Sequence, residues 1–220
     1  MRRRIYQPDG LEKTVKFGRW SPKFKKSPCR DLEWYVLCRE IDEAKGIKRA
    51  LLLSKYALFR EEFDDYGPIW NDSYIRKILN GEFIERAFSA EEQARLVRVL
   101  DGEPFDSFDN VMEDWQKEWL TKRLTGDNDW VEEFYLRWRV DRVFMLSEGE
   151  CLRYLPNLSD RICQLWEEEA PKPMFDCWWW LRSAYGRMGV RGVGNTGCFR
   201  GYGSHGDPGG AVRPALWINE

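Results

Sequence analysis

The cysteine and histidine residues are the side chains of this sequence most able to act as nucleophiles or metal ligands. The chain has six cysteines, and its one histidine is His205. No two cysteines stand in a C-x-x-C arrangement, so the sequence assembles no local zinc site. We therefore expect mostly buried, reduced thiols and no metal or other cofactor. One alternative stays open, in which Cys177 and Cys198 form a reactive pair.

A glycine-rich stretch near the C-terminus could offer a different chemistry. Ten of the 18 glycines lie between Gly186 and Gly210, and residues 192–197 match G-x-G-x-x-G. That motif binds a dinucleotide when a strand precedes it and a helix follows it. Five more glycines follow within thirteen residues, and they would break such a helix. We expect no nucleotide site here.

Residues 183–210 have instead the composition of a displayed binding loop. Tyrosine and arginine alternate with glycine, serine and asparagine, a mixture typical of protein interfaces and paratopes. The stretch has one acidic residue and three arginines, so it favours a partner with an acidic or aromatic patch. The expected contact residues are Tyr185, Arg187, Arg191, Asn195, Thr196, Phe199, Arg200, Tyr202, Ser204, His205 and Asp207.

The same stretch is also defined by residues that it lacks. Lys, Glu, Gln, Met and Trp account for 51 of residues 1–182, so 28 residues of that composition should contain roughly eight of them. Residues 183–210 contain one, Met188. Loop polarity does not explain this deficit, because Lys, Glu and Gln are ordinary loop residues.

The elements that must position this stretch are short strands and helices, as in an α+β domain spanning residues 1–220. An edge strand at 14–22 and strands at 32–39, 50–54, 142–147, 177–183 and 211–219 are expected, the last with Pro214 at its start or at a bulge. Helices are expected at 72–79, ending at Asn80-Gly81, at 159–169, and after Ser89, which forms a capping box with Glu92. Residues 103–140 predict a helical hairpin, and 183–210 a long loop between two strands.

Composition excludes several classes of protein. Charged residues make up 33% of the chain and nearly cancel at a formal net charge of −2, so the chain as a whole is not a basic nucleic-acid binder. Aromatic residues at 15% exclude global disorder. No run of about 18 apolar residues and no signal peptide are visible, so we expect no membrane insertion and a soluble protein, cytoplasmic or phage-associated.

Seven segments resemble, in order, a bacterial and phage domain family of undefined biochemical function. They are Leu32–Leu37, Ala50–Leu58, Trp70–Phe83, Ala87–Glu92, Asp141–Ser147, Trp179–Ser183 and Gly210–Ile218. The resemblance fails mainly at 103–140, which would be an insertion. It implies a C-type lectin-like fold, in the variant of the formylglycine-generating enzyme, with small antiparallel sheets, flanking helices and a long glycine-rich C-terminal loop.

Some members of that family are variable proteins of diversity-generating retroelements. In these a reverse transcriptase randomises adenines, chiefly in asparagine codons, and such codons never become Lys, Glu, Gln, Met or Trp. The resemblance therefore explains the deficit and implies that 183–210 is a diversified region between the motifs Arg182-Ser183 and Gly210–Pro214. Strands Trp178–Leu181 and Ala215–Ile218 would anchor it, with their tryptophans in the core.

The expected function is non-catalytic binding of a protein or cell-surface ligand, and other readings remain open. One is an oxidase similar to the formylglycine-generating enzyme that uses Cys177 and Cys198. Another is nucleic-acid binding through the basic runs at 2–4 and 23–26, although the body has no recognisable nucleic-acid module. A calcium-dependent lectin is disfavoured, because one carboxylate in the loop cannot supply the oxygen ligands that Ca²⁺ requires.

Overall fold

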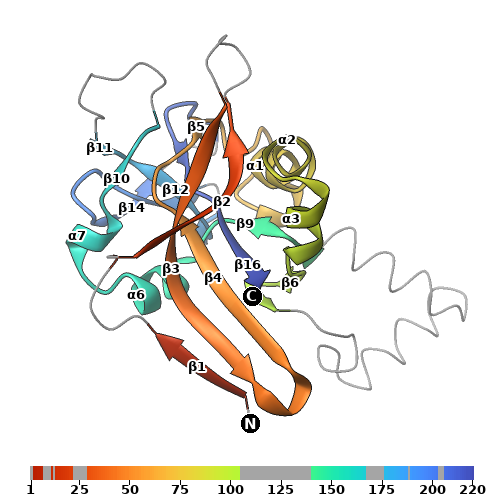
Figure 1. Cartoon of the computed structure of the whole chain (residues 1–220). Helices are drawn as coiled ribbons and strands as arrows, with labels where there is room; N and C mark the ends of the chain where they lie inside the picture. Colours follow the sequence, from red (N-terminus) through yellow and green to blue (C-terminus); the bar gives the residue numbers. More distant parts are fainter. Residues whose placement is uncertain are drawn as a thin grey trace, which may run out of the picture.

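The computed structural model describes residues 2–6, 11, 13–21, 29–104, 140–166, 176–187, 189–202 and 206–220. These residues form an α+β structure of mostly antiparallel sheets and short helices (Figure 1). The prediction of an α+β fold is confirmed at this level. The predicted helical hairpin lies outside the described residues, except for its two ends.

The largest sheet has six strands and contains the first and last strands of the described chain. Its order is β1-β3-β4-β16-β9, and β1 and β2 pair with different halves of β3. The strands are β1 (Arg2–Tyr6), β2 (Thr14–Trp20), β3 (Arg30–Asp42), β4 (Ile47–Ser54), β9 (Val143–Phe144) and β16 (Ala215–Asn219). The expected strands at 14–22, 32–39 and 50–54 are thereby confirmed. Between β3 and β4 lies the short 3-10 helix η1 (Glu43–Lys45).

A five-stranded sheet with the order β14-β13-β12-β15-β5 contains two strands formed by the glycine-rich stretch, β13 and β14. Its strands are β5 (Phe59–Arg60), β12 (Trp179–Tyr185), β13 (Gly189–Val193), β14 (Phe199–Tyr202) and β15 (Ala211–Val212). The prediction of one long loop at 183–210 is therefore wrong. Val190 and Val193 are fully buried in β13, and burying them stabilises a strand where glycine content alone suggests a loop.

Two smaller sheets complete the strand pairing. β6 (Val99–Leu100) pairs on its two sides with β7 (Glu103–Pro104) and β8 (Val140–Asp141). The chain therefore leaves this sheet at residue 104 and returns to it at residue 140, as an insertion requires. The second is the pair of β10 (Cys163–Gln164) and β11 (Asp176–Cys177).

The first group of helices continues past its predicted end. η2 (Trp70–Asp72) and α1 (Tyr74–Ile78) lead into a π-helical turn at Leu79–Phe83 and then into α2 (Ile84–Ala87). Asn80-Gly81 is thus a kink and not a terminus. The Asn80 side chain accepts hydrogen bonds from the N–H groups of Arg142, at 2.7 Å, and Val143, at 3.2 Å. These tertiary bonds, with fully buried Phe83 beyond them, favour continuing the helix along the core.

The remaining helices are short and capped. α3 (Ala90–Arg95) begins with the predicted capping box of Ser89 and Glu92, which is confirmed. α6 (Glu148–Tyr154) has a second capping box, and α7 (Leu158–Arg161) ends before β10. The helix expected at 159–169 is therefore too long, because the chain is extended from Ile162 to its bridge at Leu165.

The C-terminal segment is divided between the two large sheets. The expected single strand at 211–219 is broken at Arg213-Pro214, with β15 in the five-stranded sheet and β16 in the six-stranded sheet. Proline has no N–H to donate to a ladder, which suits it to this crossing point. The expected strand at 142–147 is likewise shortened to β9.

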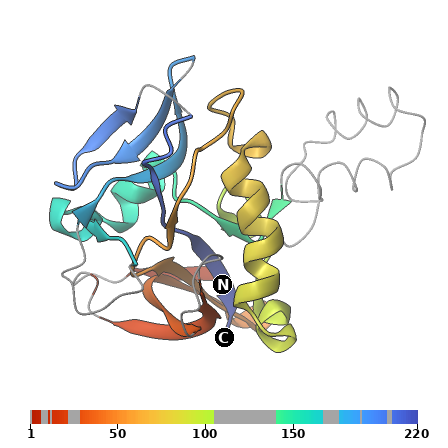
Figure 2. The ribbon, with the colours of Figure 1, turned by 90° about the horizontal axis from the view of Figure 1, so that it is seen from above.

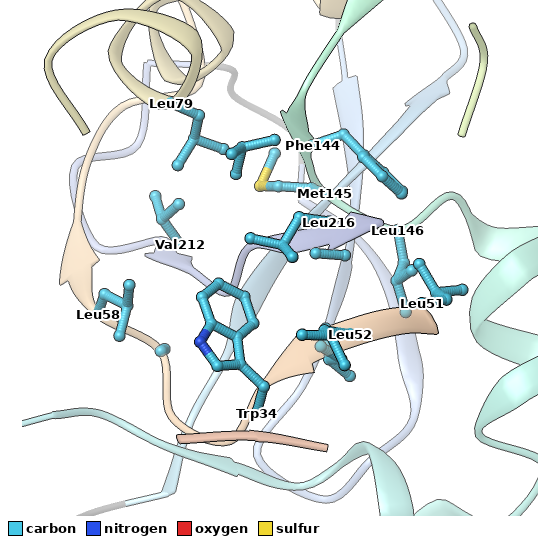
Figure 3. Close-up of a cluster of buried hydrophobic side chains, with 14 of the residues drawn as sticks. Trp34, Leu51, Leu52, Leu58, Leu79, Phe144, Met145, Leu146, Val212 and Leu216 are labelled. Carbon is cyan, nitrogen blue, oxygen red and sulfur yellow. The ribbon is translucent and has the colours of Figure 1, made fainter. Parts of the chain in front are cut away.

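The core lies between the sheets and the helices. Buried side chains from β3, β4, β9, β15, β16 and the π-helical turn at Leu79–Phe83 meet there (Figure 3), and Trp34 donates its indole N–H to the Phe17 carbonyl at 2.7 Å. Figure 2 shows the blue strands β12–β14 at the far end of the molecule from the red and orange strands of the large sheet. No described helix is both long and apolar enough to cross a membrane.

Candidate ligand-binding surface

β12 enters the glycine-rich stretch from a buried, hydrogen-bonded base. Trp179 and Trp180 are both fully buried, as the sequence predicts for the anchoring tryptophans. Trp179 donates its indole N–H to the Arg161 carbonyl and Trp180 donates to the Glu61 carbonyl, each at 3.0 Å. Each ring is therefore held both by packing and by one directional bond to the scaffold.

The motif Arg182-Ser183 joins this strand to α6. The Arg182 guanidinium binds both carboxylate oxygens of Glu150, with Nη2 to Oε1 at 2.8 Å, and donates to the carbonyls of Met145 and Asp101 at 2.7 and 2.9 Å. Ser183 accepts a hydrogen bond from the Glu148 N–H at 2.9 Å. Both side chains are thus bound to the scaffold at the start of residues 183–210.

The motif Gly210–Pro214 closes the stretch in the same way. A β-carbon at Gly210 would lie 1.9 Å from Trp180 Nε1, so the ring packs against bare backbone. The carbonyl of Gly210 accepts from Glu61 N and that of Pro214 from Ser54 N, at 3.0 and 2.9 Å. Residues 183–210 therefore lie between two anchored junctions.

Between these junctions the chain forms an antiparallel meander, which we call the variable sheet (residues 183–202). Its register places Arg191 opposite Gly201 and Gly192 opposite Arg200. Each arginine therefore has a glycine, which has no side chain, as its direct cross-strand partner. Successive residues of a strand point to opposite faces, so the two arginines lie on different faces of the variable sheet.

Five of the expected contact residues are exposed on the variable sheet. Tyr185, at 49% exposure, and Arg187 lie at the turn between β12 and β13. Asn195 and Thr196 lie at the turn between β13 and β14, and Arg200 lies on the edge strand β14. They follow the rim of the meander and do not converge on one pocket. Such an arrangement suits contact with a broad surface.

Three other expected residues are half-buried and already engaged with the protein. The Arg191 guanidinium stacks 4.1 Å over the Tyr185 ring and pairs with Glu148 at 3.0 Å. Phe199 lies under the Arg161 guanidinium at 4.6 Å. Asp207 accepts a hydrogen bond from the Gly209 N–H at 2.8 Å and thereby shapes its own turn. The Tyr202 side chain, Ser204 and His205 lie outside the described residues.

The scaffold helices contribute residues to this surface that the sequence analysis did not identify. α6 supplies Glu148, and α7 supplies Arg161 and the backbone of Leu158 (Figure 1). A β-carbon at Gly197, whose φ is +81°, would lie 2.1 Å from the Leu158 carbonyl oxygen. The spacing of Ser147 and Glu150 is a visible capping-box signal for α6, but no local pattern shows which strand a helix will contact.

The cysteines and the basic N-terminal run can also be placed. All six cysteines are reduced thiols; Cys38, Cys151, Cys163 and Cys177 are buried, whereas Cys29 and Cys198 are exposed. Burial raises the pKa of the Cys38 thiol to about 11 and that of Cys151 to about 12. The register pairs Cys177 with Cys163 and not with Cys198.

Arg2–Arg4 belong to β1 and are not a loose basic tail. Arg4 pairs with Glu40 at 3.2 Å and also with Glu103. The second basic run, at 23–26, lies outside the described residues. In the described part of the chain, no three His, Cys, Asp or Glu side chains gather in a way that could hold a metal ion.

Comparison with known proteins identifies a family but no characterised relative. No curated protein and no solved structure matches the chain. The model of one family, described as a domain of unknown function (DUF6273), matches residues 48–220. These residues include the two junctions, the variable sheet and both scaffold helices beside it. The chain therefore belongs to the DUF6273 family.

Proposed function

We propose that this protein is a non-catalytic ligand-binding protein whose residues 183–210 are diversified by a retroelement and displayed on a C-type lectin-like scaffold. The proposal rests on one coincidence above all. Residues 183–210 contain no Lys, Glu, Gln or Trp and one Met, and they lie between two junctions, Arg182-Ser183 and Gly210–Pro214, that are tied to the scaffold by side-chain packing and hydrogen bonds.

The backbone of the variable sheet supports tolerance to sequence change. β13 pairs on both sides through main-chain groups, with β12 and with β14. Main-chain hydrogen bonds do not depend on side-chain identity, so exposed positions can change while the ladder persists. Exposed substitutions usually change the free energy of unfolding by no more than about 0.5 kcal/mol.

Charge indicates the class of ligand. No carboxylate of the described residues pairs with Arg187 or Arg200, and both arginines are exposed, as is Tyr185. Tyrosine and arginine are the residues most enriched at energetic hot spots of interfaces. We infer a protein ligand with an acidic or aromatic patch, bound along the rim of the variable sheet.

Deep sequencing of the locus in a population tests the diversification. Codons 183–210 should vary far more than codons 30–60, with the changes concentrated at Tyr185, Arg187, Asn195, Thr196 and Arg200. Buried positions in the same stretch should stay constant. Equal diversity in codons 183–210 and codons 30–60 would contradict the proposal.

A display library tests the binding function directly. The five exposed positions are randomised together, and the library is selected on an acidic protein. The matched library randomises five exposed positions on β2 and β3 of the large sheet. Folded, selectable binders should come from the first library and not from the second. If the two libraries yield binders equally often, the variable sheet has no special role.

A further inference from the structure

Two buried thiols face each other where the scaffold meets the base of the variable sheet. Cys163 in β10 and Cys177 in β11 are direct partners in an antiparallel pair. Their exposures are 2% and 3%, and both are reduced thiols. The β-carbons of directly opposite residues lie about 4.5–5.5 Å apart and on the same face, and a disulfide needs about 3.5–4.5 Å. A small approach of the strands brings the two sulfurs within bonding distance.

From this placement we infer that Cys163 and Cys177 are a redox modification site, a dithiol that closes reversibly to a disulfide under a peroxide oxidant. The inference does not depend on the proposed function. It also differs from the reactive pair considered from the sequence, because Cys198 is exposed in the turn before β14.

The surroundings of Cys177 supply positive charge for a thiolate. Arg213 is buried at 1% exposure, donates from Nε to the Ser54 carbonyl at 2.9 Å, and leaves Nη1 without a hydrogen-bond partner. A hydrogen bond with Cys163 and burial raise the pKa of Cys177 above its ordinary value. The charges of Arg60 and Arg213 offset only part of this rise. The resting pair is therefore two protonated thiols beside an incompletely satisfied cation.

The oxidation balances with one peroxide molecule. One thiolate attacks a peroxide oxygen, the O–O bond breaks, and a sulfenic acid and hydroxide form; the hydroxide takes up the thiol proton and leaves as water. The second sulfur attacks the sulfenic sulfur, the S–O bond breaks, and the S–S bond forms with release of a second water. The two sulfurs lose two electrons, which reduce the peroxide to two waters. An external dithiol reverses the process.

The disulfide would lock the segment that supports the variable sheet. Cys177 is separated by one residue from Trp179, the first residue of β12. Cys163 follows soon after α7, and the Arg161 carbonyl of that helix accepts the Trp179 indole N–H. Trp166 N donates to the Ala57 carbonyl at 2.7 Å. A covalent link here would hold α7, which contacts Gly197 and Phe199 of the variable sheet, against the strand that begins that sheet.

The test uses the full chain with both exposed thiols removed, Cys29→Ser and Cys198→Ser, so that disulfides between molecules do not form. Purified protein is treated with hydrogen peroxide, digested without reduction and analysed by mass spectrometry. We expect a peptide joining Cys163 to Cys177, with a mass 2 Da below the sum of the reduced peptides. The closed loop has 15 residues, so Tm should rise by roughly 6–12 °C and return to its starting value with dithiothreitol.

Two variants in that background separate this pair from a general thiol effect. Cys177→Ala should abolish the peptide and the rise in Tm, while Cys151→Ala, which removes a buried thiol outside the pair, should keep both. Overturning results are the absence of a Cys163–Cys177 peptide, a link from Cys177 to another cysteine, or a link that leaves Tm unchanged. Because the peptide is mapped with Cys163 and Cys177 intact, poor folding of the alanine variants does not affect this test.

Discussion

Replacing Gly210 by alanine tests whether packing sets the boundary of the variable stretch. The new β-carbon would lie 1.9 Å from Trp180 Nε1 and 2.2 Å from Cε2, far inside van der Waals contact. The Trp180 ring is fully buried and cannot rotate into solvent. Either this ring or the backbone before β15 must therefore move, and the indole bond to the Glu61 carbonyl is lost or weakened.

The cost has two parts. Overpacking of a well-filled core costs about 1–3 kcal/mol, and losing the indole hydrogen bond at a buried carbonyl costs about 1 kcal/mol. We expect the free energy of unfolding to fall by about 2–4 kcal/mol. For a chain of this length, that corresponds to a fall in Tm of roughly 5–15 °C. Circular dichroism gives the melting curve, and tryptophan fluorescence should report the displaced ring.

Two other glycines provide matched controls. A β-carbon at Gly201 would meet only the ring of Tyr185, which is half exposed and can rotate away, so Gly201→Ala should cost less than about 1 kcal/mol. Gly149 in α6 has no atom within 4 Å of its β-carbon position, so Gly149→Ala should leave Tm unchanged or raise it slightly. If Gly210→Ala melts within about 2 °C of the unsubstituted protein, the packing argument is refuted.

Three further predictions concern charge, thiol exposure and ionisation. Arg182→Ala removes a nearly buried, bidentate partner of a carboxylate and should lower the free energy of unfolding by about 3 kcal/mol, whereas Arg187→Ala should change it by less than about 0.5 kcal/mol; equal urea midpoints for the two variants would contradict the assigned roles. In the native protein at pH 8, iodoacetamide should modify Cys29 and Cys198 only, and mass spectrometry in denaturant should count six adducts. Because burial raises the pKa of Cys151 to about 12, the folded state holds its thiol proton after the unfolded state has lost it. Stability should therefore fall as pH rises above about 9, and a flat profile from pH 9 to 11 would contradict this.

Elements governed by local signals could be predicted from the sequence. The capping box at Ser89 needs only two residues three positions apart, and β4 contains the wholly apolar run 50–53. The end predicted at Asn80-Gly81 failed because the Asn80 side chain bonds to residues more than 60 positions away. Asn80-Gly81 has the local sequence of a helix end, and no neighbouring residue indicates those distant partners.

The candidate surface was predictable in composition but not in form. The missing residue types marked a region that contains positions 183 to 210, and five of the expected contact residues are exposed. Ten glycines suggested a loop, because a count of glycines does not reveal that Val190 and Val193 pack into the core between them. The partner of Cys177 was equally hidden, since strand register decides which of the other cysteines lies opposite, and register is not visible in a two-residue strand.

A surface can be randomised without unfolding its scaffold only if the residues that vary are not the residues that stabilise the fold. Here the buried tryptophans, the Arg182–Glu150 pair and the main-chain bonds at residues 210–214 lie outside or at the limits of the stretch. Within it, Gly197 is restricted by its positive φ and by the Leu158 carbonyl, so a side chain there would strain the backbone. Five exposed substitutions at about 0.5 kcal/mol each total about 2.5 kcal/mol at most, below the roughly 5–15 kcal/mol typical of a folded domain. A random change at Gly197 would strain the backbone, and one at Val193 would disturb the buried core. Selection should therefore keep both residues constant even if their codons are accessible to the mutagenic process.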